Sequence, residues 1–257
     1  MSVPTARQLK EAAGLGRRKG REATGHFLVE GWRSVMSALD AGASIEHVFV
    51  SPGLVIPEGD ESRLPADVVV LDVSDREMKK LSDVSSPPGI LAVVRQPETG
   101  LTDPWPDRVL LLDGVQDPGN VGTLIRTAAW LGIEAVVIGP GTADPFAPKV
   151  VRSTMGGLWD VEMTRVEDLA GWLAHAAGQG ARIWVTDMAG TPLGDWQPSW
   201  PSVVVIGNEA HGVSDAVRRA ATGTIAIEGA SGPRAVESLN AAVAGAIVMS
   251  HWAAGPV

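Results

Sequence analysis

The apolar positions of this chain fall into short runs separated by amphipathic segments, a pattern that predicts alternating strands and helices. The unit around which the rest is arranged begins with the apolar run 109–112, which is short enough for one strand buried on both faces. A helix is predicted over 121–131, where apolar residues recur on one face and Gly132 supplies the stop. A second strand at 135–138 completes a βαβ unit. Because open parallel sheets bind ligands where their strands end, the polar loop after the first strand is a candidate site.

The same pattern extends along the chain and divides it in two. Residues 1–96 form a small α/β domain, 97–106 a proline-rich linker and 107–257 a larger α/β domain. A short helix and then a mobile, glycine-containing basic loop are expected within 1–24. The end of a strand and a turn are expected at 26–31. Strands are expected at 45–50, 68–71, 90–94, 109–112, 135–138, 181–186, 202–206 and 224–227, and helices at 32–41, 75–81, 121–131, 149–157, 166–179, 215–221 and 238–252.

Three segments of the larger domain share one design, a buried strand followed by a glycine-containing polar loop and a helix. They are residues 113–126, 207–214 and 229–240. At the carboxyl edge of one parallel sheet, these loops would line a single pocket. Gly207 stands directly after a strand and would let backbone meet a flat ligand group.

Taken singly, the polar residues of these loops have ordinary explanations. Asn120 suits a helix N-cap and Arg126 a solvated helix face. Glu209 would be an exposed loop acid, and Ser238 would cap the last helix. Asn240 fits less well, because asparagine is a weak helix former. Taken together, the three loops favour a site in which Arg126 is the cation that pairs with Glu209.

Composition excludes several other chemistries. Apolar residues make up 45% and charged residues 20%, as in ordinary globular proteins, and the lack of cysteine rules out disulfides and thiolate chemistry. The five histidines show no ligand spacing, so no metal is expected. Glycine motifs for dinucleotides or phosphates and the motifs of serine hydrolases and zinc proteases are absent from the sequence. No apolar run approaches the ~18 residues of a membrane span and no signal-peptide core is present, so a cytoplasmic protein away from membranes is expected.

Charge is distributed unevenly along the chain. The net charge of −9 argues against a protein that coats nucleic acid. Residues 1–34 nevertheless hold seven basic and three acidic side chains, a local charge of +4. Such local density favours contact with phosphate, and a solvated, frayed terminus is the alternative. The candidate phosphate-binding residues are Arg17, Arg18, Lys19 and Arg21.

Three motifs follow one another through the larger domain. They are Asn120-x-Gly122 with Arg126-Thr127-Ala128, then Gly207-Asn208-Glu209-x-x-Gly212, and last Glu237-Ser238-Leu239-Asn240. In this order they resemble the signature motifs of the SpoU/TrmH family, RNA ribose 2′-O-methyltransferases of the SPOUT superfamily. Residues 1–95 resemble the substrate-binding domain of many members, through 27–31 and the strand at 45–50.

The resemblance implies a SPOUT domain, in which helices cover both faces of a parallel sheet and the C-terminal segment is threaded into a trefoil knot. It implies that S-adenosylmethionine binds in the knot, by position near Gly207, Ile227 and Leu239. A homodimer with its site at the interface is expected, with RNA as partner. Members with such an N-terminal domain often act on ribosomal RNA, which we expect here in preference to transfer RNA.

The resemblance also implies roles for the motif residues. Arg126 is expected to clamp an RNA phosphate and stabilise charge, because a guanidinium is a poor base. Asn120 and Glu209 are expected to position Arg126 and the ribose. Ser238 and Asn240 are expected to hold the methionine end of the cofactor or the third motif. The group that removes the hydroxyl proton stays unassigned.

One segment, 228–236, departs from the family pattern. Members commonly have Ile-Pro-Met and a short glycine loop before the third motif, whereas 228–236 is longer and lacks that proline. The different loop affects the expected role of Ile227 in cofactor binding more than that of any other residue, and Arg234 adds a candidate RNA contact.

A second function is a non-catalytic RNA- or ribosome-binding module with the same fold. The sequence contains all four polar motif residues that catalysis would need, which favours the enzyme. They are Asn120, Arg126, Glu209 and Asn240.

Overall fold

The computed structural model describes residues 2–58, 60, 64–65, 68–98, 100–101, 103–230 and 238–255. The chain forms two compact units, each with its own sheet and core. Unit 1 comprises Met1–Glu98 and Asp144–Trp159, and unit 2 comprises Thr99–Ala143 and Asp160–Val257. Within these described stretches, no helix is long and apolar enough to cross a membrane.

The segment 144–159 belongs to unit 1, although the sequence places it within the larger domain 107–257. Aromatic packing explains this. The Phe146 ring lies 4.9 Å from the Phe27 ring between centroids, and the Trp159 ring lies 5.9 Å from it. Phe27 and Phe146 are both fully buried, so this segment completes the core of unit 1.

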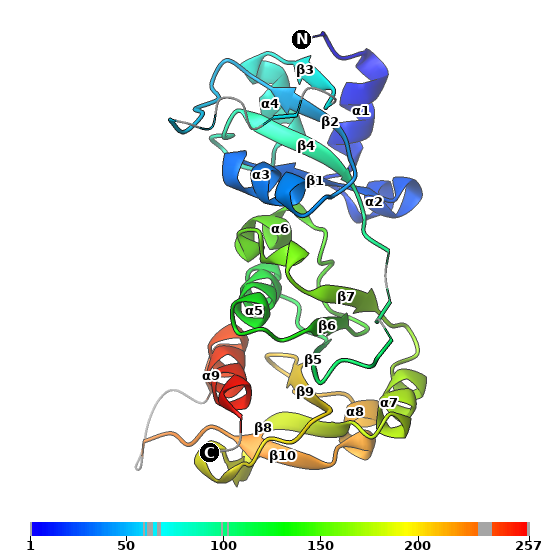
Figure 1. Ribbon diagram of the computed structural model, residues 1–257, viewed down its shortest axis with the longest axis vertical. Coiled ribbons are helices and arrows are strands. Elements are labelled where there is room, and N and C mark those ends of the chain that lie inside the picture. Colours follow the sequence, from blue (N-terminus) through cyan, green and yellow to red (C-terminus); the bar gives the residue numbers. More distant parts are fainter. Residues whose placement is uncertain are drawn as a thin grey trace. The chain divides into compact units, whose positions relative to one another are not determined.

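Within its described residues, unit 1 has a sheet of four strands in the order β1-β4-β2-β3 (Figure 1). The strands are β1 His26–Glu30, β2 Ile45–Val50, β3 Val70–Asp72 and β4 Ile90–Arg95. β4 runs antiparallel to both β1 and β2, and β3 runs parallel to β2. The continuous apolar sequence of β4 fits its interior place in the sheet, where five of its six residues are buried.

Helices from both parts of unit 1 pack on this sheet. Buried residues of α1 (Ala6–Gly14) and α4 (Asp75–Leu81) form one core with Leu28, Phe49 and Leu91. Helices α3 (Trp32–Asp40) and α6 (Pro148–Thr154) contact β1. Successive strand residues point to opposite faces, so Phe27 of β1 lies on the face opposite Leu28.

The basic segment near the N-terminus is a helix, and the expectation of a mobile loop there is wrong. Helix α2 spans Arg18–Thr24 and ends at Gly25, which has a positive φ of 67°. A Cβ atom on Gly20 would lie 2.2 Å from the carbonyl oxygen of Gly14. Glycine is therefore required where α2 approaches the end of α1, and it does not mark a flexible loop.

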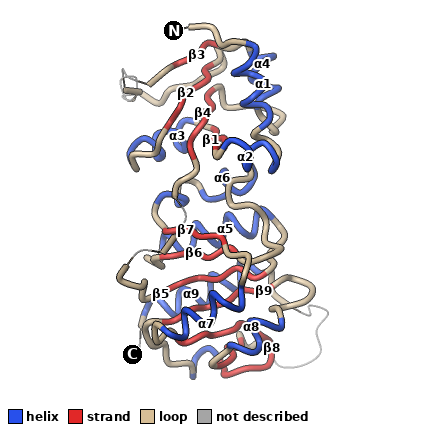
Figure 2. The backbone as a smooth tube through the Cα atoms, turned by 90° about the vertical axis from the view of Figure 1, so that its right-hand side faces the viewer, coloured by secondary structure: helices blue, strands red, loops and turns tan. Residues whose placement is uncertain are grey.

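The sheet of unit 2, as far as it is described, has six parallel strands in the order β10-β8-β9-β5-β6-β7. Figure 2 shows its strands lying one above another, with helices overlapping them in the view. The strands are β5 Arg108–Asp113, β6 Ala135–Ile138, β7 Glu162–Arg165, β8 Arg182–Pro192, β9 Ser202–Gly207 and β10 Gly223–Ala226. Both central strands, β5 and β9, are almost entirely buried, which their unbroken apolar sequences predict.

Helices cover both faces of this sheet (Figure 1). Helices α5 (Pro118–Trp130) and α9 (Ala241–Ala254) lie on one side, and α7 (Leu169–Gly178) and α8 (Asp215–Ala220) on the other. Short 3₁₀ helices span Gly157–Trp159 in unit 1 and Leu193–Asp195 in unit 2. The predicted α/β class, with helices on both faces of a parallel sheet, is confirmed.

Two features of unit 2 were beyond the sequence pattern. Strand β7 was not predicted, because it is a four-residue edge strand with polar ends. The last helix begins at Ala241, three residues after the expected start. The trefoil knot stays a prediction, since the chain leading into α9 includes residues 231–237, which lie outside the described residues.

His47 gives the stability of unit 1 a defined dependence on pH. It is 7% exposed, its Nε2 atom has no hydrogen-bond partner, and its ring meets Phe49 edge-on. Burial lowers the pKa of His47 from its ordinary value, with a smaller opposing effect of Glu46 and a further lowering by His26. As the pH falls through about 6.5, the unfolded chain takes up this proton before the folded chain does, so the free energy of unfolding decreases.

We predict that His47→Phe removes this contribution. Urea unfolding of the wild type should show a free energy that falls between about pH 7.5 and 5.5, and the variant should show a smaller fall. The two proteins should differ least at the upper pH. Equal pH dependence in both proteins would contradict the assignment to His47.

Candidate active site

Parallel strands bring the loops after β5 and β9 to the same edge of the unit 2 sheet. Asp113 ends β5 and is paired in register with Gly207 at the end of β9. Asp113 is 5% exposed, and its carboxylate accepts a 2.6 Å hydrogen bond from the backbone N–H of Ser214. The two loops are thus fastened to each other at their bases.

Asn208 holds the loop after β9 in shape. Its amide nitrogen donates to the carbonyl oxygen of Gly114 at 2.7 Å, and its amide oxygen accepts from the backbone N–H groups of Ala210 and His211. Backbone bonds of 2.9 Å join Asn208 and Gly212 in both directions. The result is a closed five-residue loop that presents Glu209 at its tip.

Three predicted site residues, each from a different motif, form one chain of side-chain hydrogen bonds. The amide nitrogen of Asn240 donates to the amide oxygen of Asn120 at 3.0 Å. The amide nitrogen of Asn120 then donates to Oε1 of Glu209 at 2.8 Å. The other oxygen of Glu209 accepts from the backbone N–H of Gln116 at 3.5 Å. The sequence prediction that the three motifs meet is therefore supported by direct contacts.

The start of α9 determines which end of each amide donates and which accepts in this series of hydrogen bonds. The amide oxygen of Asn240 accepts from the backbone N–H groups of Ala242 and Val243, at 2.9 and 3.2 Å, and so caps the helix. Its amide nitrogen is consequently turned toward Asn120, whose own nitrogen is turned toward Glu209. Each amide has one way to satisfy both neighbours, so the Glu209 carboxylate has a fixed position.

The helix caps differ from two expectations. Asp117 caps α5 by accepting from the backbone N–H of Asn120 at 2.9 Å, so the Asn120 side chain is free for the site. Asn240 caps α9, and Ser238 lies before the cap as an exposed residue. Sequence reasoning assigned the caps to Asn120 and Ser238 as ordinary alternatives, and both assignments are wrong.

Arg126 does not pair with Glu209, so that expectation is also wrong. Arg126 is exposed and makes no ion pair or hydrogen bond with any residue that the structure describes. It follows Asn120 by six residues in α5, which places it about 9 Å along the helix and about 120° around it. The guanidinium is therefore available to an external group.

Close packing of α9 on α5 brings Asn240 to Asn120. A Cβ atom on Gly245 would lie 2.3 Å from Cδ2 of the buried Leu124 and 3.6 Å from Cδ1 of Ile206. A side chain at position 245 would have to displace the Leu124 side chain, so glycine lets the two helices approach without that shift.

The residues expected near the cofactor have different surroundings. A Cβ atom on Gly207 would lie 2.6 Å from the carbonyl carbon of Gly212, so loop closure by itself requires glycine there. Ile227 is half-buried directly after β10. Leu239 precedes Asn240 and is 46% exposed. It is thus an exposed apolar side chain next to the hydrogen-bonded residues Asn240, Asn120 and Glu209. Backbone at the sheet edge with an apolar neighbour suits a ligand that carries both polar and apolar groups.

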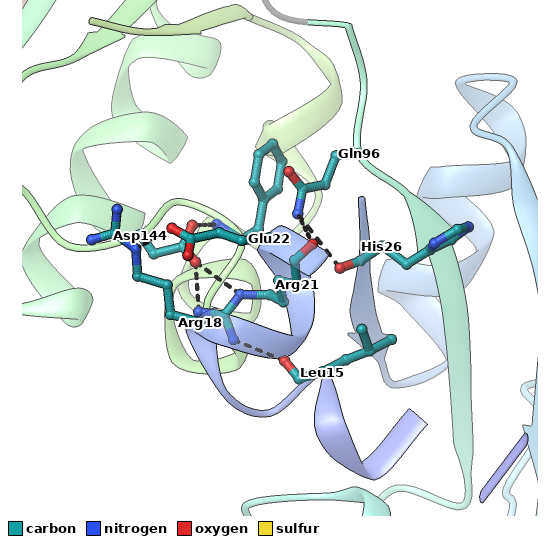
Figure 3. A network of polar contacts seen from close by, with 8 residues as sticks. Leu15, Arg18, Arg21, Glu22, His26, Gln96 and Asp144 are labelled. Atoms are coloured by element: carbon teal, nitrogen blue, oxygen red, sulfur yellow. Dashed lines mark hydrogen bonds and ion pairs between the residues drawn. The ribbon is translucent and has the colours of Figure 1, made fainter. Parts of the chain in front are cut away.

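The basic residues near the N-terminus split into exposed and buried ones. Arg17, Arg18 and Lys19 are exposed, and Arg18 pairs with Glu22 at 2.6 Å. Arg21 is 3% exposed, and Figure 3 shows its guanidinium turned inward between two partners. They are the Asp144 carboxylate and the Leu15 carbonyl oxygen, each at 2.8 Å.

The prediction that Arg21 contacts RNA is therefore wrong. Burial lowers the pKa of Arg21, and its charge is matched by a carboxylate that is itself 7% exposed. The residue joins α2 to the segment 144–159 within unit 1. Arg234, the further candidate RNA contact, lies outside the described residues.

Sequence reasoning missed Asp113 and Asn208 as site-building residues. Both belong to the polar loops that it singled out, and Asn208 stands inside the second motif. Only their bonds to Ser214 and Gly114 show that they fasten the loops. Among the described residues, no three His, Asp or Glu side chains gather as a metal site would require.

Comparison with known proteins assigns this geometry to a family. Residues 107–250 match the model of the SpoU rRNA Methylase family, and residues 6–92 match the MRM3-like substrate binding domain. The chain is 32% identical over 249 residues to the 23S rRNA (guanosine(2553)-2′-O)-methyltransferase RlmP of Bacillus subtilis, with 95% of each chain covered. It is 30% identical over 242 residues to the 23S rRNA (uridine(2479)-2′-O)-methyltransferase of Streptomyces viridochromogenes, covering 90% of this chain and 84% of that one.

A solved structure agrees over nearly the whole length. The crystal structure of the SpoU methyltransferase AviRb from Streptomyces viridochromogenes in complex with the cofactor AdoMet has a TM-score of 0.85. Identity is 27%, and 98% of each chain is covered. The chain belongs to the SpoU rRNA methylase family, and by class it is an RNA 2′-O-methyltransferase that uses S-adenosylmethionine.

We predict that Asn120→Asp lowers the rate of methyl transfer by about 10- to 150-fold. The substitution replaces a donor to Glu209 with a second carboxylate, and a hydrogen bond to a charged group contributes about 1.5–3 kcal/mol. Methyl incorporation at saturating cofactor and RNA measures the effect. Thr123→Ala, at an exposed position of the same helix, is the matched control and should keep its rate. A fully active Asn120→Asp protein would show that the chain of amides is dispensable.

Proposed function

We propose that this protein transfers the methyl group of S-adenosylmethionine to a ribose 2′-hydroxyl of ribosomal RNA. The observation that carries the proposal is the hydrogen-bonded chain from Asn240 through Asn120 to Glu209. It unites all three motifs at the sheet edge of a chain that belongs to this methyltransferase family. We further infer that the enzyme acts in the cytoplasm.

The ribose is held by Glu209 in this proposal. A carboxylate accepts about four hydrogen bonds, and Asn120 and the Gln116 N–H occupy two of these positions. The remaining lone pairs on this exposed side chain accept the ribose hydroxyl and fix its orientation. Bound S-adenosylmethionine supplies the electrophilic methyl group, and Gly207, Ile227 and Leu239 are the residues proposed to hold it.

Arg126 clamps the phosphate next to the reacting ribose. Its guanidinium is exposed and makes no ion pair or hydrogen bond within the described part of the chain. It therefore acts through charge and position, and it stabilises negative charge that develops as the hydroxyl proton leaves. Ser238, directly before the capped turn of α9, is proposed to line the same site.

The relatives favour the large-subunit RNA but leave the nucleotide open. Both curated relatives described above are named as 23S rRNA 2′-O-methyltransferases, one acting on guanosine 2553 and the other on uridine 2479. Because their target bases differ, we infer that the site at the sheet edge contacts the ribose and phosphate. We infer that base selection lies elsewhere in the chain.

We also infer that the enzyme is a homodimer whose interface includes α9. Val243 is 49% exposed and Ile247 is 38% exposed, and their spacing of four residues puts them on one face of this helix. Leu239, four residues before Val243, is 46% exposed. An exposed apolar stripe beside a site indicates a covering surface, and a second copy supplies it.

The test of the proposed activity is transfer of labelled methyl from S-adenosylmethionine to ribosomal RNA, set beside transfer RNA. We expect the label in ribosomal RNA at an alkali-resistant linkage, the mark of a 2′-O-methyl group. Arg126→Ala should lower the rate about 10- to 150-fold through loss of a charged contact, while cofactor binding is retained. Arg219→Ala, an exposed arginine on α8, is the matched control.

Two results would contradict the proposal. Unchanged turnover of Arg126→Ala would remove the phosphate clamp. Cofactor binding with no label in either RNA, or in assembled subunits, would favour a binding module over an enzyme.

The dimer is tested separately. Ile247→Glu buries a charge if α9 lies at an interface, so light scattering should report a monomer where the wild type is a dimer. Met188→Glu is the matched control, because Met188 is also apolar and 77% exposed but lies on β8. A monomeric wild type, or a dimeric Ile247→Glu protein, would contradict this interface.

A further inference from the structure

Unit 1 contains a small polar cavity that the methyl-transfer site does not use. It has a volume of about 260 Å³ and lies between the start of α4, the loop after β2 and the loop before β4. Ligand pockets for drug-sized molecules span roughly 300–1,000 Å³, so this cavity suits a single planar ring system. Its lining includes Ser51, Gly53, Asp75, Met78 and Lys79, together with residues 85–87.

Ser51 points to a ligand because its hydroxyl has no partner. The residue is 5% exposed and lines the cavity, yet its hydroxyl makes no hydrogen bond with any residue that the structure describes. Its backbone groups are satisfied, by the carbonyl oxygen of Gly89 and the N–H of Leu54. The hydroxyl is not itself buried but opens onto the cavity, so it can bond to a group bound there.

Asp75 and Lys79 are two charged side chains that form no ion pair within the described part of the structure. They stand four residues apart on α4, a spacing at which ion pairs commonly form, but they do not pair with each other or with other described residues. The helix cap does not need Asp75 either. Ser74 and Glu77 complete a reciprocal capping box at 2.8 and 3.3 Å.

The acidic and hydroxyl groups converge over Gly53. A Cβ atom built on Gly53 would lie 3.6 Å from Oδ1 of Asp75 and 3.8 Å from Oγ of Ser51. These are ordinary contact distances, and no backbone atom lies among the neighbours of that Cβ. Glycine is thus not required by the fold at this position, but its missing side chain keeps open the space between the two oxygens.

The chemistry of the lining selects one kind of ligand. An aspartate that accepts two hydrogen bonds matches the N1–H and N2–H donors on the edge of guanine, and Met78 and Pro87 supply apolar wall for its ring. Lys79 at the same cavity suits the phosphate that follows the base. A bare anion is disfavoured because the Asp75 carboxylate would repel it.

We propose that this cavity binds an unpaired guanine of the RNA substrate and so contributes the base selection that the methyl-transfer site lacks. The inference rests on the proposed function for its substrate, ribosomal RNA. It adds a recognition subsite in unit 1, with Asp75 as the specificity-determining residue and Ser51 as a second contact.

The experiment uses the full-length protein and fragments of 23S ribosomal RNA in which guanosine is partly replaced by inosine, which lacks the N2 amine. RNA retained by the wild type should be depleted of inosine at one unpaired position. Asp75→Asn should lose this depletion and bind RNA about tenfold more weakly, because the amide presents a donor to a donor. Asp72→Asn, at an exposed strand end of the same unit, is the matched control.

Two further variants keep the test independent of folding. Gly53→Ala should place a methyl group between the Asp75 and Ser51 oxygens and raise KM for RNA about tenfold with kcat unchanged. Lys79→Ala should weaken RNA binding and reduce its salt dependence, whereas its exposed neighbour Lys80→Ala should do so less. Urea unfolding of each variant checks that unit 1 stays folded.

The outcomes separate this inference from the proposed function. Methylation by the wild type with an Asp75→Asn protein that matches its control would overturn the guanine subsite alone. Asp75-dependent inosine depletion without methylation would support the subsite and overturn the proposed activity. Binding of free guanosine monophosphate, unaffected by RNA, would overturn the RNA subsite in favour of a nucleotide site.

Discussion

The strands of the unit 2 sheet run in one direction, and the position of the site depends on this constraint. Parallel strands place all their carboxyl ends at one edge, so loops that are about 90 residues apart in sequence become neighbours. The buried central strands β5 and β9 hold Asp113 level with Gly207. Polar residues can gather there without cost to the core, because the apolar strands are already covered by helices on both faces.

A second constraint works within that edge. The cap of α9 and the carboxylate of Glu209 are connected by two amide side chains, so helix capping and site geometry are one hydrogen-bonded system. An amide has a donor end and an acceptor end, and fixing one end fixes the other. An aspartate or a leucine at position 120 or 240 would lack the amide donor and could not make both contacts. Arg126 stands apart from this system, which suits a side chain that meets a flexible substrate.

In unit 1, one basic residue near the N-terminus is buried in an ion pair, whereas its basic neighbours are exposed. Arg21 lies within a basic cluster, yet it is buried against Asp144, which is 123 residues away in sequence. Its neighbours Arg17 and Lys19 stay exposed. A buried guanidinium needs a carboxylate partner, and here that partner fixes the segment 144–159 to unit 1. The cavity near Asp75 is the reverse case, in which charges and a hydroxyl lie close together without pairing.

The sequence by itself determined the α/β class, the main strands and helices, and the family. Hydrophobic periodicity depends on local spacing, and the motifs are short enough to be recognised in one dimension. It therefore also identified Asn120, Glu209 and Asn240 as members of one site. Tertiary structure alone decided that Asp117 and Asn240 are the caps, that Arg126 stays apart from Glu209, and that Arg21 is buried. These outcomes depend on which distant group satisfies each donor or charge, and local sequence carries no information about that choice.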